Sequence, residues 1–160
     1  MTRSQVREIV MHISFAQGAN PRPVLEVLEQ LLDREYYQSL GEEDELYAQY
    51  PSAKQIAYLR RMAEGVTEHL VELDLYIEKY ARGWKISRIS RVAMAIMRVS
   101  MFEVLYMQDI PGSASINEAV EIAKAYEEAE TVSFINGILG SFIREEMPGL
   151  EDPVTPVEAP

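Results

Sequence analysis

The sequence of 160 residues contains no cysteine. This absence excludes disulfide bonds, thiolate zinc sites and cysteine nucleophiles, and it is typical of proteins from a reducing compartment. Histidine is scarce too, since only His12 and His69 occur. Ile9 and Val66 precede them by three residues, so the Glu-x-x-His pairs that build di-iron sites in helical bundles are missing.

Recognisable catalytic motifs are also lacking. The sequence has no nucleophile elbow, no phosphate-binding loop and no dinucleotide fingerprint. We interpret the two histidines as surface or packing residues and the many glutamates as solvated helix faces. We therefore expect a protein that binds other macromolecules, that is not an enzyme, and that needs neither a metal nor a cofactor.

Long apolar runs do not occur either. No stretch approaches the roughly 18 apolar residues that a membrane-spanning helix needs. The first eight residues include Arg3, Arg7 and Glu8 and no long apolar core, so no signal peptide is expected. These features favour a cytoplasmic protein without membrane association.

Basic residues are few, with 15 lysines and arginines against 26 aspartates and glutamates, for a net charge of -11. Taken alone, this charge argues against a nucleic-acid-binding protein, because such binding depends on cations that contact phosphates. The distribution is uneven, however, since residues 79–98 contain six basic residues and no acidic one. This basic island is compatible with a binding surface, but a solvated basic face, or internal ion pairs made by Arg98 and Glu103, would explain it equally well.

Helical periodicity extends over almost the whole chain, and it predicts an all-α protein of about seven helices in two packed helical subdomains. Capping boxes are expected at Ser52 with Gln55 and at Ser115 with Glu118. The expected helices span Arg3 to Gln17, Pro23 to Ser39, Ser52 to Ala81, Ser87 to Tyr106 (one helix, or a short one and a longer one), Ser115 to Tyr126 and Thr131 to Met147.

We expect residues 1–147 to form one domain, with subdomains at about 1–81 and 82–147. Residues 148–160 contain four of the eight prolines and no basic residue. This acidic and proline-rich composition predicts a disordered tail.

The first helix carries a second stripe beside its apolar face. Arg3, Arg7, Met11 and Phe15 recur at every fourth position and would form a ladder along the helix. Cations beside an aromatic ring suit single-stranded RNA, which needs charge for its phosphates and a ring for stacking. Alternatively, Met11 and Phe15 pack against a neighbouring helix and the arginines are simply solvated.

The last helix contains two glycines, Gly137 and Gly140, within an apolar frame. Each glycine inside a helix costs about 1 kcal/mol relative to alanine. We therefore expect another helix, within this chain or in a partner, to approach closely at these positions.

Three segments form a recognisable combination. They are Gly83-Trp84 with Arg88-Ile89, Ile96-Met97-Arg98 and Phe102-Glu103, then I-N-E-A-V-E-I-A-K-x-Y at residues 116–126, and then F-I-N-G-I-L at residues 134–139. In this order and spacing they resemble the NusB family of bacterial transcription antitermination factors. The resemblance covers roughly residues 3–144.

This resemblance implies a fold of two packed helical halves and a function without catalysis. Members of the family pair with NusE, a protein of the small ribosomal subunit. The pair binds the single-stranded boxA element in leader transcripts of ribosomal RNA and joins the RNA polymerase elongation complex, which suppresses premature termination.

The resemblance also implies which residues bind. The RNA-binding positions of the family match Arg3, Arg7 and Phe15 in the first helix and Glu130, Ser133 and Phe134 at the start of the last helix. The NusE-binding surface matches the region from Arg88 to Glu103, with Arg88, Arg91, Met94 and Arg98 as the expected contacts.

The chain departs from the family pattern at several positions. The arginine cluster at the start is reduced to Arg3 and Arg7, the acidic residue that usually precedes the Ile-Met-Arg arginine is Ala93, and the basic residue that often precedes the last phenylalanine is Ser133. Fewer cations mean fewer phosphate contacts. We therefore expect weak binding to free RNA that depends on NusE. The alternative is a NusB-like protein-interaction scaffold with weak or no RNA binding.

Overall fold

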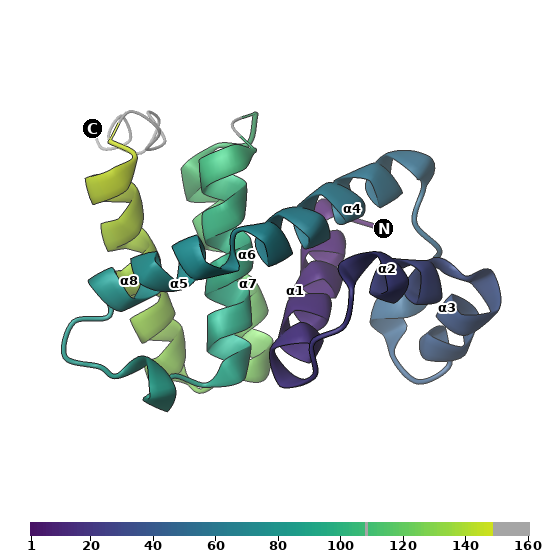
Figure 1. The fold of residues 1–160 in the computed structure, drawn as a ribbon, viewed down its shortest axis with the longest axis horizontal. Coiled ribbons are helices and arrows are strands. Elements are labelled where there is room, and N and C mark those ends of the chain that lie inside the picture. The colour runs from purple at the N-terminus through teal and green to yellow at the C-terminus, as the bar shows by residue number, and fades with distance from the viewer. Residues whose placement is uncertain (108, 149–160) are drawn as a thin grey trace. The chain divides into compact units, whose positions relative to one another are not determined.

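The computed structural model describes residues 1–107 and 109–148, and this part of the chain contains eight α-helices, two short 3-10 helices and no strand (Figure 1). The all-α prediction is thereby confirmed, with eight helices in place of about seven. None of the helices in the described residues is both long enough and apolar enough to cross a membrane. The predicted disordered tail lies outside the described residues from residue 149 onward.

The chain divides into two compact units, Met1–Glu68 and His69–Pro160. The sequence placed the division near residue 81, one helix later. The first unit contains α1 (Arg3–Ala19), α2 (Val24–Leu32), α3 (Arg34–Gly41), η1 (Glu45–Tyr47) and α4 (Ala53–Glu68). The second contains α5 (Leu70–Tyr80), η2 (Ile86–Arg88), α6 (Arg91–Tyr106), α7 (Gly112–Tyr126) and α8 (Ala129–Glu146).

In the first unit, α4 packs across α1 and also contacts α2, while α3 contacts α2 and η1 (Figure 1). Side chains from α1, α2 and α4 are fully buried, among them Val10, Leu28 and Leu59. The predicted capping box at the start of α4 is confirmed. The amide of Gln55 donates to Ser52 Oγ at 3.2 Å, and the amide of Ser52 donates to Gln55 Oε1 at 3.0 Å.

Two helices expected to be continuous are interrupted. The expected helix from Pro23 to Ser39 breaks at Asp33, whose carboxylate accepts a hydrogen bond from the Tyr36 amide at 3.0 Å and thereby caps α3. Aspartate favours this position because its short side chain can satisfy a free amide at a helix start. The expected helix from Ser52 to Ala81 breaks at His69, between α4 and α5.

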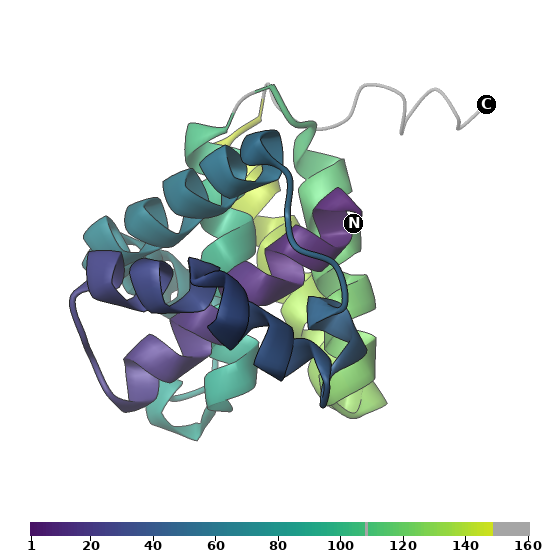
Figure 2. The ribbon, with the colours of Figure 1, turned by 90° about the vertical axis from the view of Figure 1, so that its right-hand side faces the viewer.

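In the second unit, α6, α7 and α8 pack against one another and α5 lies across α6 and α8 (Figure 1 and Figure 2). The central helix is α6, which contacts α5, α7 and α8. Nearly every residue from Ala93 to Val104 is buried. The periodic apolar pattern of this segment thus marks a helix that is covered on most of its circumference.

The helices α7 and α8 begin earlier than expected. α7 starts at Gly112, directly after Pro111, so the expected capping box at Ser115 is wrong. Ser115 lies inside the helix, and its hydroxyl donates to Glu103 Oε1 at 2.6 Å in the core. α8 begins at Ala129, two residues before the expected Thr131.

The expectation that a helix of this chain closely approaches the glycines of α8 is also wrong, whereas an approach by a helix of a partner stays a prediction. A Cβ atom added at Gly137 would meet no described atom within 4 Å, and one added at Gly140 would meet the side chain of Arg144 alone. The close approach occurs instead at Gly41, where a Cβ atom would lie 2.5 Å from the backbone oxygen of Tyr47.

We expect the substitutions Gly41→Ala and Gly137→Ala to have opposite effects on stability. Gly41→Ala forces the backbone of η1 away and lowers the free energy of unfolding by about 1–3 kcal/mol, the usual range for overpacking. The added methyl group of Gly137→Ala points into open space on a helix, so this substitution raises the free energy of unfolding by about 0.5–1 kcal/mol. Urea unfolding of both variants beside the parent protein tests this. A stabilised Gly41→Ala variant would contradict the tight contact.

Candidate nucleic-acid interface

The first helix presents Arg3 at an open position. Thr2 caps the helix in a capping box with Gln5, so the first turn is well ordered. The Arg3 guanidinium lies 4.6 Å from the centre of the Tyr58 ring on α4, and the Arg3 side chain is exposed. A cation held over an aromatic ring keeps its outer face available for a phosphate.

The predicted ladder on α1 is only partly on the surface. Arg7 is 7% exposed and Met11 is 2% exposed, whereas Phe15 is 37% exposed. The packing interpretation therefore holds for Met11, and the buried position of Arg7 differs from the open one that a phosphate contact requires. A spacing of four residues advances about 40° more than one helical turn, so the four positions rotate by about 120° along the ladder. This rotation carries the middle of the ladder into the protein.

α1 is fixed to η1 through His12. Its Nδ1 atom lies 2.8 Å from the Tyr47 hydroxyl, and the two rings lie 5.9 Å apart. Burial lowers the pKa of His12 below its usual value of 6.5, although the charges of Glu8 and Asp44 oppose the shift. The neutral imidazole is therefore part of the folded first unit.

The start of α8 brings the other three predicted RNA-binding residues together. Glu130 and Ser133 are exposed, and Phe134 is half-buried. The Phe134 ring packs against Trp84, with ring centroids 4.7 Å apart and planes inclined by 53°. Two aromatic rings thus meet at the start of α8.

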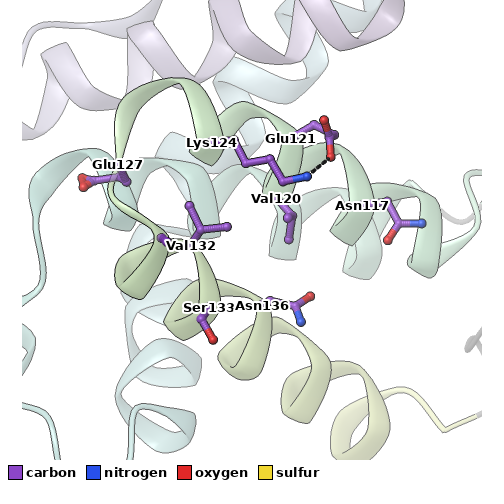
Figure 3. A pocket seen from close by; sticks show the side chains of 9 residues that line it. Asn117, Val120, Glu121, Lys124, Glu127, Val132, Ser133 and Asn136 are labelled. Carbon is purple, nitrogen blue, oxygen red and sulfur yellow. Dashed lines mark hydrogen bonds and ion pairs between the residues drawn. The ribbon is translucent and has the colours of Figure 1, made fainter.

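A groove of about 520 Å³ lies between α7 and α8 (Figure 3). Its polar side chains are carboxamides, a hydroxyl, carboxylates and an ammonium group, which offer both donors and acceptors of the kind that read the edges of unpaired bases. Lys124 is paired with Glu121 at 2.7 Å along one rim. The groove is lined by Asn117, Val120, Glu121, Lys124, Glu127, Ala129, Val132, Ser133 and Asn136. Ser133 is the one predicted RNA-binding residue in this lining.

The predicted NusE-binding residues fall into two classes. Arg88 and Arg91 are exposed at the end of η2 and the start of α6. Met94 is 5% exposed, and Arg98 binds Asp74 of α5 through two hydrogen bonds of 2.7 and 2.9 Å. Met94 and Arg98 therefore stabilise the second unit from within, and only the two outer arginines present a surface.

Arg98 makes the internal ion pair that the sequence offered as an alternative to a binding role. Its partner is Asp74 on the neighbouring helix α5, because Glu103, five positions further along α6, points about 140° away from Arg98. The fully buried Glu103 instead accepts a hydrogen bond from the Ser115 hydroxyl.

Two exposed apolar features were missed by the sequence analysis. On α5, Leu70, Val71 and Leu75 are 39%, 75% and 60% exposed. Val71 and Leu75 are four residues apart and lie outside the buried face of α5. The sequence signal for this patch is an apolar pattern that covers more of the helix than its core-facing side. The other feature is Trp84, which is 50% exposed in the segment between α5 and α6.

Known proteins match this chain over most of its length. The model of the NusB family matches residues 4–144. A protein of Thermoanaerobacter sp. (strain X514), named transcription antitermination protein NusB, is 35% identical over 152 residues, which cover 95% of this chain and 96% of the relative. The protein of the same name from Clostridium botulinum (strain Kyoto / Type A2) is 34% identical over 143 residues, which cover 89% of this chain and all of the relative.

Solved structures agree with these sequence matches. The structure of T. maritima NusB has a TM-score of 0.74 and 28% identity, with 99% of this chain and 98% of that chain covered. The crystal structure of the antitermination factors NusB and NusE in complex with dsRNA has a TM-score of 0.68 and covers 89% of this chain and 96% of that chain. At 17% identity, the second match supports the fold alone.

We expect the Arg98–Asp74 pair to stabilise the second unit. Arg98→Gln leaves the half-buried carboxylate without its two donors, so the free energy of unfolding should fall by about 1–3 kcal/mol. The double variant Asp74→Asn, Arg98→Gln should lose less than the sum of the two single losses. Chemical unfolding of the four proteins measures this coupling, and strictly additive losses would show that the pair contributes nothing.

We expect His12 to make the first unit sensitive to mild acid. Since its pKa in the folded state lies below 6.5, the unfolded state binds more protons as the pH falls past 6.5, and the free energy of unfolding decreases. The parent protein should therefore lose more stability between about pH 7.5 and about pH 5.5 than the His12→Asn variant. Urea unfolding of both proteins across this pH range measures the loss. An equal decrease in the free energy of unfolding for the two proteins would rule out this role.

Proposed function

The chain belongs to the NusB family of transcription antitermination proteins, and we propose that it performs this function by binding boxA-type single-stranded RNA together with NusE. The carrying observation is the similarity to relatives of this name along nearly their whole length. The RNA in question is the leader of ribosomal RNA transcripts. The bound complex joins the RNA polymerase elongation complex in the cytoplasm and suppresses premature termination, and the chain itself catalyses no reaction.

We propose RNA-binding residues in each unit separately. In the first unit, exposed Arg3 supplies a phosphate contact and half-exposed Phe15 supplies a ring for stacking. In the second unit, Ser133 and Asn136 in the groove supply hydrogen-bonding groups for base edges, and Phe134 adds a second ring. Arg7 contributes less than the sequence suggested, because it is buried.

The small number of exposed cations limits the affinity for free RNA. Binding to nucleic acid gains most of its free energy when phosphate contacts release counterions. A chain with a net charge of -11 and one open arginine at the start of α1 gains little from this source. We therefore propose that the chain binds RNA weakly alone and that NusE supplies the missing contacts.

The proposed NusE-binding surface includes the outer face of α5. The exposed side chains of Leu70, Val71 and Leu75 offer an apolar centre of the kind found in protein interfaces. Arg88 and Arg91 of the same unit are exposed as well and can supply polar contacts. The crystal structure of NusB and NusE in complex with dsRNA, which shares this fold, supports such an assembly by analogy.

A second candidate function is that of a protein-interaction scaffold with weak or no RNA binding. The net charge of -11 and the burial of Arg7 favour it. The scaffold and the antitermination factor would share the surface for NusE, so the two functions differ in whether the complex retains RNA.

We expect fluorescence anisotropy with labelled leader RNA to show weak binding by the chain alone and tighter, salt-sensitive binding with NusE. Arg3→Ala should weaken binding with NusE and flatten the slope of log affinity against log salt by about 0.7, the value for one phosphate contact on a single strand. Arg144→Ala, at the far end of α8, is the matched control and should leave both unchanged. Association with NusE without any RNA binding would establish the scaffold instead.

A further inference from the structure

Trp84 is the only tryptophan of the sequence, and half of its side chain is exposed. It lies in the turn that follows α5, where its amide donates to the backbone oxygen of Ala81 at 3.0 Å. Gly83 precedes it with a φ of 81°, a conformation that glycine adopts easily and other residues rarely do. The backbone of this turn therefore fixes the position of the Trp84 Cα atom, from which the indole projects.

The indole is also supported from one side. Phe134 of α8 packs against it with ring centroids 4.7 Å apart, and Phe134 is itself half-buried. A large aromatic ring that is anchored on one side and open on the other loses little conformational entropy when a second flat ring stacks on it. The exposed half of Trp84 is thus a preformed stacking surface.

The residues that flank Trp84 in the sequence carry a positive net charge. Arg82, Lys85 and Arg88 are all exposed, and residues 79–98 contain no acidic side chain. Acidic groups do lie at the adjacent start of α8, where Glu127 accepts a hydrogen bond from Ser90 and Glu130 stays exposed. The cations on the side of the turn are therefore the ones available for phosphates.

The residues around Trp84 along the chain favour a nucleic acid over a protein as its ligand. Protein interfaces have a continuous apolar centre, as on α5. Between residues 79 and 98, all of which the structure describes, Trp84 is the only large apolar side chain that is exposed. One ring among several cations is the pattern that binds a base and its flanking phosphates.

We propose that Trp84 stacks on an unpaired base of the bound RNA and that Arg82, Lys85 and Arg88 contact its phosphates. This inference rests on the proposed RNA-binding function and extends the RNA surface from α8 to the turn between α5 and α6. It also reassigns Arg88 from the NusE contacts to the RNA contacts.

The single tryptophan provides the test. The chain is labelled with 5-fluorotryptophan, mixed with unlabelled NusE and titrated with single-stranded boxA-type RNA, while ¹⁹F NMR follows the one resonance. We expect this resonance to shift when RNA is added and to stay in place when NusE alone is added. A shift caused by NusE alone, with no further change on adding RNA, would overturn the proposal in favour of a protein contact.

Affinities of variants provide the second readout. Trp84→Leu should weaken RNA binding with NusE about tenfold, within the range for loss of one stacked base, whereas Trp84→Phe keeps a ring and should lose about threefold or less. Arg82→Gln should reduce the salt dependence, and Arg144→Gln should not. Thermal unfolding of each variant confirms that it is folded.

The outcomes separate this inference from the proposed function. RNA binding by the parent complex with an unmoved resonance and an unaffected Trp84→Leu variant overturns the stacking role but leaves the antitermination function intact. Absence of RNA binding by the parent complex overturns both.

Discussion

The burial of α6 is the constraint on which the second unit depends. Eleven of its sixteen residues are buried, and its neighbours α5, α7 and α8 all pack against it. A helix covered on most sides must satisfy its polar side chains internally, because an unpaired buried charge costs far more than a hydrogen bond returns. Glu103 therefore binds Ser115 of α7, and Arg98 binds Asp74 of α5. These contacts hold α5 and α7 against α6, and the outer faces of the two helices remain available for binding.

This constraint explains why residues that look functional in the sequence are divided between two roles. Arg98 and Met94 belong to the same basic segment as Arg88, but the inner turns of α6 carry the first two into the protein, and the preceding η2 leaves Arg88 outside. The same division occurs on α1, where Arg3 is open and Arg7 is buried. A charged residue type indicates a capacity to bind, whereas its position on the helix decides whether a ligand can reach it. Among the cations predicted to bind, the exposed ones are Arg3, Arg88 and Arg91, which lie at the start of a helix or in the segment just before it.

Local patterns predicted the fold well, and contacts distant in sequence decided the rest. The all-α class and the capping box at Ser52 follow from periodicity and from hydrogen bonds within four residues, so the sequence sufficed for them. Ser115 has the same local pattern, but the helix starts earlier at Gly112 and a buried carboxylate on α6 takes its hydroxyl. The contact of Trp84 with Phe134 joins residues fifty positions apart, and no local pattern contains it. The start of α8 could thus be predicted as part of the site only through the family resemblance, and Trp84 only from the structure.

The net charge of -11 sets how RNA can be held. An acidic chain repels a phosphate backbone at long range, so attraction must come from contacts within about 10 Å, where local cations outweigh the screened total. Stacking suits this situation, because the interaction of a ring with a base involves little charge and is not weakened by distant carboxylates. Phe15, Phe134 and Trp84 are all at least partly open, and the exposed cations Arg3, Arg82 and Lys85 lie at a helix start or in the turn after α5. Aromatic contacts would then supply much of the affinity of this chain for RNA, and a basic partner would supply the electrostatic attraction that the chain lacks.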